Sequence, residues 1–196
     1  MSPYKFAHLS SAHPRFDTRI FFKECTSLAN HGYDVSLIVA DGYGHEVRSN
    51  VAVYDVGASK GRLDRIRNVP DRVLAKAVDL DADIYHLHDP ELIPIGIRLK
   101  KLGKIVIFDA HEDYVAKILS KTWIHPNLRQ ITLILFRTYY NYALKKLDGI
   151  VVASNYIKVN NDNKIEYRNL PNLNLKRKKK ITRNSNMNTI LYTGGL

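Results

Sequence analysis

Short apolar runs alternate with amphipathic stretches along the chain, a pattern that predicts strands separated by helices. Strands are expected at residues 5–9, 35–40, 51–56, 84–89, 105–109 and 149–153, with a short edge strand at 164–168. Helices are expected at residues 18–31, 70–80, 91–102 and 128–146, and a polar, basic loop at 57–67. Near-continuous apolar strands joined by helices are typical of a parallel sheet covered on both faces. The predicted fold class is therefore α/β, a doubly wound, Rossmann-like parallel sheet.

The composition of the chain predicts three parts. Residues 1–171 carry the strand and helix pattern, and residues 172–188 are polar, basic and rich in Asn, which indicates a linker. Residues 189–196 are an apolar run followed by Gly194 and Gly195. We interpret them as the first strand and glycine turn of a second α/β domain that is otherwise missing, so that the chain would be a fragment. Alternatively, this last strand adds to the edge of the first sheet.

The charge of the chain favours an anionic partner. The formal net charge is +11 for 196 residues, which points to nucleic acid, an anionic membrane face or phosphorylated substrates. Aromatic residues do not interleave with the basic run Lys176–Lys180, so stacking on single-stranded nucleic acid is not supported. The helix expected at 128–146 has a wide apolar face with basic flanks, which indicates either a core helix or a helix that lies on an anionic membrane.

The cysteine content and the N-terminus indicate the compartment. Cys25 is the single cysteine, which excludes an internal disulfide and fits a reducing environment. The start of the chain has no apolar signal segment, and no apolar run approaches the roughly 18 residues that span a bilayer. We therefore expect a cytoplasmic protein, which can still contact the inner face of the membrane.

Two of the expected strands end in histidine and aspartate. His86 and His88 alternate onto one face of a strand and Asp89 follows them. In open α/β sheets ligands bind beyond the carboxyl ends of the strands, so these tips predict a ligand site. The two histidines, with a third ligand from His111 or Asp113, could bind zinc. The alternative is that one histidine packs in the core and the other lines a cleft; no His-x-x-x-His or cysteine spacing supports a metal, and none is expected. Asp89 is expected to cap the following helix.

The second strand tip continues through Asp109, His111, Glu112 and Asp113. An imidazole beside carboxylates can hold or transfer a proton, which makes His111 a candidate for chemistry. The alternative is that the acidic run only caps local backbone and lies in solvent.

The loop after the first strand contains no glycine, so a dinucleotide fingerprint is absent and NAD or FAD is not expected there. The loop does place His13, Arg15 and Arg19 beside a helix N-terminus, where Asp17 or Thr18 is the expected cap. Such a position suits an anion. The alternative for the two arginines is a solvated surface.

An ordered set of motifs resembles the N-terminal half of a glycosyltransferase of the GT-B fold, in the large retaining family 4. The resemblance runs through nearly the whole chain, and its motifs are His13–Ile20, Leu28–Val35, His86–Asp89, Phe108–Glu112, Val152–Ser154, Asn169–Asn172 and Ile190–Leu196. Many relatives have paired glycines in the first loop and this chain does not, which leaves the class of acceptor open.

The resemblance implies a sugar transferase that retains anomeric configuration, uses a nucleotide-sugar as co-substrate, and needs no cofactor or metal. It implies that this domain binds mainly the acceptor and that His111 is the catalytic histidine. Gly194 and Gly195 would lie beside the donor phosphates. The residues implied to bind substrate are His13, Arg15, Asp17, Arg19, His88, Asp109 and Glu112.

We therefore expect a domain of a glycosyltransferase of cell-surface polysaccharide assembly, inactive without its C-terminal domain. Its partners would be a nucleotide-sugar donor, a glycan or lipid-phosphate acceptor and, peripherally, an anionic membrane, with no nucleic acid expected. The alternatives are a nucleotide-sugar epimerase of similar fold, and a basic module that binds nucleic acid or membrane.

Overall fold

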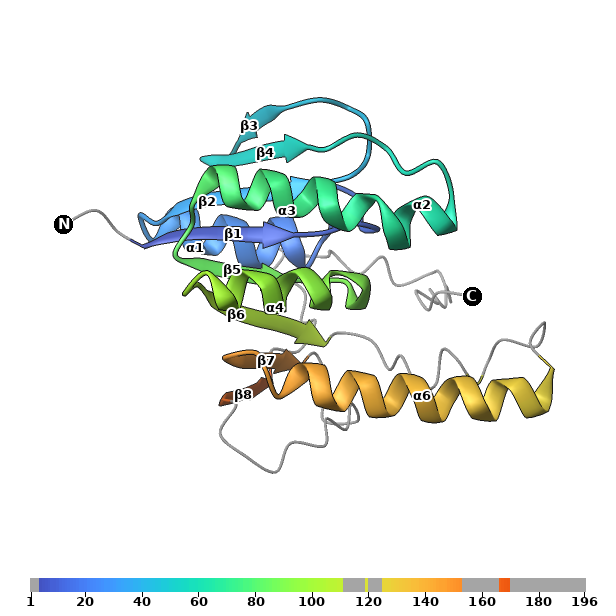
Figure 1. Ribbon diagram of the computed structural model, residues 1–196. Coiled ribbons are helices and arrows are strands. Elements are labelled where there is room, and N and C mark those ends of the chain that lie inside the picture. The colour runs from blue at the N-terminus through green and yellow to red at the C-terminus, as the bar shows by residue number, and fades with distance from the viewer. Residues whose placement is uncertain (1–3, 111–118, 120–124, 153–165, 170–196) are drawn as a thin grey trace, which may run out of the picture.

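The computed structural model describes residues 4–110, 119, 125–152 and 166–169 (Figure 1). The described strands form one eight-stranded sheet in the order β3-β4-β2-β1-β5-β6-β7-β8, and every neighbouring pair is parallel except β3 and β4. The strands are β1 Lys5–Leu9, β2 Asp34–Val39, β3 Glu46–Arg48, β4 Val51–Asp55, β5 Ile84–Leu87, β6 Ile105–Ala110, β7 Gly149–Val152 and β8 Glu166–Asn169. The predicted α/β fold class is confirmed, and β8 is the expected edge strand.

The helices cover both faces of this sheet. They are η1 Ile20–Cys25 (a π-helix), α1 Thr26–Asn30, α2 Arg62–Arg67, α3 Val69–Leu80, η2 Pro90–Leu92 (a 3₁₀ turn), α4 Ile93–Lys101 and α6 Pro126–Leu144. Side chains of α3, α4 and α6 share one apolar core with β1, β5, β6 and β7, while η1 and α1 pack on the opposite face against β2 and β4. The strand order runs outward from β1 in both directions, so the carboxyl ends of β1 and β5 flank the topological switch point at which ligands bind in such sheets.

The region between β2 and α3 differs from the prediction. A strand, β3, was not expected; it pairs with β4 through the two-residue turn Ser49–Asn50. Both turn residues have positive φ, 51° and 59°, as a type I′ hairpin requires. The prediction of a loop over residues 57–67 was wrong in its second half, because Arg62–Arg67 forms α2.

The predicted helix 18–31 is two helical segments. It begins as the π-helix η1 and continues as α1, and neither has a side-chain cap of the ordinary kind. Asp17 nevertheless satisfies the first backbone donors, since its Oδ1 accepts hydrogen bonds from the N–H groups of Arg19 and Ile20 at 2.8 and 2.9 Å. Of the two predicted caps, Asp17 and Thr18, it is therefore Asp17 whose side chain binds the first backbone N–H groups of the helix.

The helix α6 contributes little to the core for its length. Its last residues, Ala143 and Leu144, are buried, but much of its apolar surface is exposed. Figure 1 shows the helix running along one side of the sheet. The exposed apolar residues are Leu128, Ile131, Ile134, Leu135, Tyr139 and Tyr142. Within the described ranges no helix has the length and apolarity needed to cross a membrane. The predicted linker 172–188 and the last strand lie outside the described residues.

Candidate functional site

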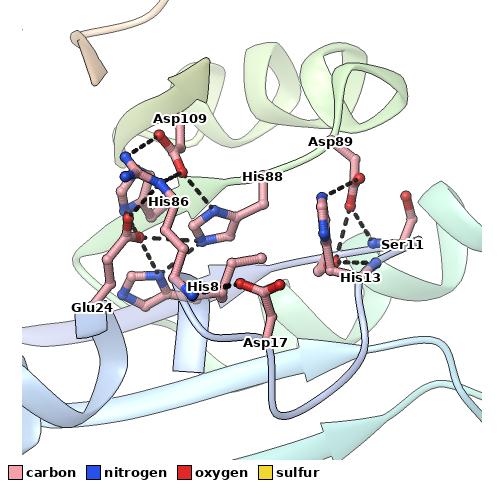
Figure 2. Close-up of polar contacts among 12 residues, drawn as sticks. His8, Ser11, His13, Asp17, Glu24, His86, His88, Asp89 and Asp109 are labelled. Carbon is pink, nitrogen blue, oxygen red and sulfur yellow. Dashed lines mark hydrogen bonds and ion pairs between the residues drawn. The ribbon is translucent and has the colours of Figure 1, made fainter. Parts of the chain in front are cut away.

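A group of three histidines and one glutamate, called here the histidine cluster, lies at the switch point (Figure 2). His8 comes from β1, His86 from β5 and His88 from the residue just after β5, while Glu24 reaches them from η1. His8 Nδ1 and His88 Nε2 are 3.0 Å apart and share a hydrogen bond. The rings of His8 and His88 are stacked, with centroids 5.2 Å apart and 11° between their planes.

The sheet register explains why these side chains meet. His8 pairs directly with His86 across the β1–β5 ladder, and alternation along the strands puts both on the face that η1 covers. Their neighbours Ala7, Leu9 and Leu87 point to the other face and join the apolar core. The histidines thus occupy positions that a parallel sheet covered on both faces normally fills with apolar side chains.

Glu24 is held against the histidines by the π-helix. Its Oε2 lies 3.8 Å from His8 Nδ1, 3.6 Å from His86 Nδ1 and 3.8 Å from His88 Nε2. Its Oε1 lies 3.2 Å from Arg19 Nε. π-Helical turns often mark functional positions in proteins, and here the turn places a carboxylate on the buried side of the segment.

Arg19 and Asp109 form a buried ion pair at the edge of the cluster. Arg19 Nε and Nη2 each donate to one carboxylate oxygen of Asp109 at 2.7 Å, and both side chains are almost fully buried. Burial alone would lower the pKa of Arg19, but the Asp109 carboxylate outweighs it and the net direction is upward. Asp109 Oδ2 also lies 3.4 Å from His88 Nδ1, so it connects the arginine to the histidine cluster.

The protonation of the cluster is strongly perturbed. Burial lowers the pKa of His8 well below its ordinary value, and the neighbouring His86 and His88 lower it further. Burial raises the pKa of Glu24 well above its ordinary value, with Asp109 adding to the rise and Arg19 opposing it. Perturbed titratable groups of this kind gather at functional sites, although buried structural networks produce them too.

A second polar group fixes the first loop. Asp89 Oδ2 accepts hydrogen bonds from Ser10 Oγ at 3.0 Å, from the Ser11 N–H at 2.7 Å and from the Ala12 N–H at 3.3 Å. Its Oδ1 lies 3.4 Å from His13 Nε2. Figure 2 shows the two side chains facing each other. Asp89 occupies the predicted N-cap position of η2, but its side chain makes no cap hydrogen bond there. It holds the loop that follows β1 instead.

Arg15 is held away from solvent. Its guanidinium donates to Asp41 through Nε and Nη2 at 2.7 and 2.6 Å, to Glu46 through Nη1, and to the Gly44 carbonyl at 3.1 Å. The hydrogen bond with Asp41 is the main reason that the pKa of Arg15 lies above its ordinary value. The alternative of solvated arginines is wrong for both Arg15 and Arg19, since each is buried in ion pairs.

The structure brings together only some of the predicted site residues. His88, Asp109 and Arg19 lie in or beside the histidine cluster, and His13 stands on the Asp89 group with 22% of its side chain exposed. Arg15 lies apart from both groups, with β2 and β3. The residues His111, Glu112, Gly194 and Gly195 lie outside the described part of the chain.

Sequence reasoning missed His8 and Glu24. A histidine inside the apolar run Lys5–Leu9 was the available signal for His8, because an imidazole on a central strand needs a polar partner. Glu24 had no such signal. The sequence predicts an ordinary helix there, and a π-helical turn changes which side chains point inward. Within the described residues these two complete a set with His86 and His88 whose atoms could hold a metal ion.

Solved structures with the same fold define the class. A sucrose-phosphate synthase from Thermosynechococcus elongatus superposes with a TM-score of 0.61 at 13% identity, over 86% of this chain and 48% of that one. An α,α-trehalose 6-phosphate synthase from Burkholderia multivorans gives 0.53 at 12% identity, over 80% and 41%. A structure described as trehalose-6-phosphate from E. coli bound with UDP-2-fluoro glucose gives 0.52 at 11% identity, over 78% and 40%. The fold is that of a Rossmann-like domain of the GT-B glycosyltransferases, and the chain spans less than half the length of these three proteins.

The family follows from the sequence. A model of Glycosyltransferase Family 4 matches residues 19–160, well over half of the chain. The chain therefore belongs to Glycosyltransferase Family 4. No curated protein matches it by sequence.

Proposed function

We propose that the chain is the acceptor-side domain of a retaining glycosyltransferase that moves a sugar from a nucleotide-sugar to a glycan or lipid-phosphate acceptor. The observation that carries the proposal is the family match over residues 19–160, which includes Glu24, His86, His88, Asp89 and Asp109 of the two polar groups. One protein of similar fold, from E. coli, is bound with UDP-2-fluoro glucose, which supports a nucleotide-sugar as donor.

The proposal includes a second domain that completes the site. The chain spans 48% and 41% of two enzymes with the same fold. We propose that donor binding belongs to a second domain. In the described residues Arg15 and Arg19 are both committed to ion pairs with carboxylates. They are therefore poor candidates for neutralising donor phosphates, and that charge has to be met by groups elsewhere, such as the proposed turn at Gly194 and Gly195.

The partly exposed polar groups suggest where an acceptor would bind. His13 keeps 22% of its side chain exposed beside Asp89, and Asp17 is half-buried at the start of η1. Both lie on the loop that leaves β1 at the switch point, where the fold presents ligands. We assign His13 to acceptor contact and retain His111 as the proposed catalytic histidine.

The proposal places the enzyme at the cytoplasmic face of a membrane, in cell-surface polysaccharide assembly. Its support is the exposed apolar surface of α6, which carries Leu128, Ile131 and Ile134 beside the basic Arg129 and Arg137. Apolar residues flanked by cations favour contact with anionic lipid. The net charge of +11 acts in the same direction.

The test is sugar transfer by a longer form of the protein that carries a donor domain. It would be incubated with a panel of nucleotide-sugars and with lipid-phosphate or glycan acceptors, and product would be followed by mass spectrometry. We expect transfer from one donor, a loss of about 100-fold or more with His111→Ala if the histidine acts in proton transfer, and unchanged transfer with the matched control His31→Ala at an exposed position. Interconversion of donor sugars without an acceptor would instead identify an epimerase.

A further inference from the structure

We propose that His8, His86, His88 and Glu24 bind one divalent transition-metal ion, zinc by preference, in a structural site that joins β1, β5 and η1. Among the described residues this is a group in which one ligand atom from each member lies within 4.8 Å of the others. Imidazole nitrogen and carboxylate oxygen are zinc ligands, and structural zinc sites are closed by four protein ligands. The inference does not rest on the proposed sugar transfer.

The distances within the group lie on either side of the spacing around a tetrahedral ion. Glu24 Oε2 lies 3.8 Å from His8 Nδ1, 3.6 Å from His86 Nδ1 and 3.8 Å from His88 Nε2. His8 Nδ1 and His88 Nε2 are 3.0 Å apart. Ligand atoms bound at 2.0–2.1 Å around a tetrahedral zinc ion are about 3.3–3.5 Å from one another. On binding an ion, His8 and His88 would move apart, Glu24 would move closer to the histidines, and the ion would replace the hydrogen bond between His8 and His88.

One of the three histidines, His88, has a carboxylate near its second ring nitrogen, as histidines in metal sites commonly do. Histidines that ligate a metal usually present their second ring nitrogen to a carboxylate or a carbonyl oxygen. Asp109 Oδ2 lies 3.4 Å from His88 Nδ1, so Nε2 of this ring faces the other ligands. Asp109 is itself fixed by Arg19, whose Nε lies 3.2 Å from Glu24 Oε1 and leaves Oε2 facing the three histidines.

A polar core without an ion accounts less well for Glu24. Both of its carboxylate oxygens are buried, and neither accepts a hydrogen bond from the described part of the chain. A buried carboxylate is costly unless it is paired, hydrogen-bonded or bound to a metal. Oε1 is paired with Arg19, and an ion between Glu24 and the three histidines would supply a partner for Oε2.

The test uses the 196-residue chain, stripped with a chelator and titrated with Zn²⁺ alone. We expect calorimetry and elemental analysis to give one zinc ion per chain. When Co²⁺ is used as the probe, we expect the intense visible absorption bands of a tetrahedral Co²⁺ site. Glu24→Gln and His86→Gln should each weaken binding by more than the roughly 10–100-fold that loss of an outer-shell partner costs. His86 is the histidine of choice because 12% of its side chain is exposed, so its replacement is the least disruptive.

The matched control is His31→Gln, at an exposed position at the end of α1 that is not part of the cluster, which should bind zinc as the unaltered chain does. Mg²⁺ should not compete, because it prefers oxygen ligands. Circular dichroism of each variant confirms that it is folded. Absence of zinc binding by the folded chain, or equal zinc affinity in His86→Gln and His31→Gln, would overturn the proposal.

Discussion

Arg19 has a role that its place in the sequence does not reveal. Its side chain reaches from the start of η1 to Asp109 at the end of β6 and binds both carboxylate oxygens. Arg19 also positions His88, because Asp109 contacts that ring, and it positions Glu24 by pairing with the Oε1 atom of Glu24. One cation thus sets the orientation of three polar side chains at the switch point.

Removal of this cation is expected to destabilise the fold. Arg19→Met would leave Asp109, which is fully buried, without its counter-charge. The expected loss in the free energy of unfolding is about 3–5 kcal/mol, measured by urea denaturation at neutral pH. Arg98→Met is the control: its ion pair with Asp71 is exposed, and its loss should cost at most about 1 kcal/mol. Equal effects of the two substitutions would show that the buried pair does not stabilise the fold.

At the scale of elements, Asp55 holds together the turns at the β4 end of the sheet. Its Oδ1 accepts hydrogen bonds from the N–H groups of Gly42 at 3.0 Å and Gly57 at 2.8 Å, and its Oδ2 from that of Gly44 at 2.9 Å. All three glycines have positive φ, which side chains with a Cβ rarely adopt. The carboxylate at the end of β4 therefore organises the loop that leads from β2 into β3.

This arrangement predicts a pH dependence. Burial tends to raise the pKa of Asp55, but the backbone N–H groups lower it and the net shift is downward. A carboxyl whose pKa is lowered on folding stabilises the protein above its unfolded pKa of about 3.9, and that stability is lost as the pH falls through the folded value. Asp55→Asn should therefore cost about 1–2 kcal/mol at pH 7, and the difference from the unaltered chain should shrink below about pH 4.

Urea unfolding of both proteins at pH 7, 5 and 3.5 checks this prediction. His45 is a titratable neighbour, because its Nδ1 accepts the Asp55 N–H, and it is present in both proteins. Only the difference between them therefore reports on Asp55. A difference that stays constant across the three pH values would contradict the prediction.

The elements show how far the sequence predicts the structure. β1, β2, β5 and β6 were predicted because their apolar runs are nearly continuous. The strand β3 was missed because Glu46–Arg48 is short and polar, and only the positive φ at Ser49 and Asn50 reveals the hairpin. Half of the histidine cluster was predicted, because alternation along a strand places His86 and His88 on the same face. The position of Glu24 depends on a π-turn, and that of His8 on the order of the strands in the sheet. No local sequence pattern predicts either.

At the scale of the whole molecule, the two polar groups lie on the same loop-bearing edge of one domain. Figure 2 shows the histidine cluster on one side and the Asp89 group on the other, both beside the loop that follows β1. The family match covers the part of this edge that comes from η1, β5 and β6, and the chain spans less than half the length of three solved proteins with the same fold. These findings favour the interpretation that this edge forms one wall of a sugar-transfer site shared by two domains.

The most direct measurement compares turnover of a nucleotide-sugar panel by the 196-residue chain and by the same chain joined to a donor-binding domain of its family. We predict no release of nucleotide above background from the chain alone, and sugar transfer to an acceptor once the second domain is present. Turnover by the chain alone would contradict the proposal that its site is half of a larger one. A folded two-domain protein that transfers no sugar from any donor would contradict the proposed function itself.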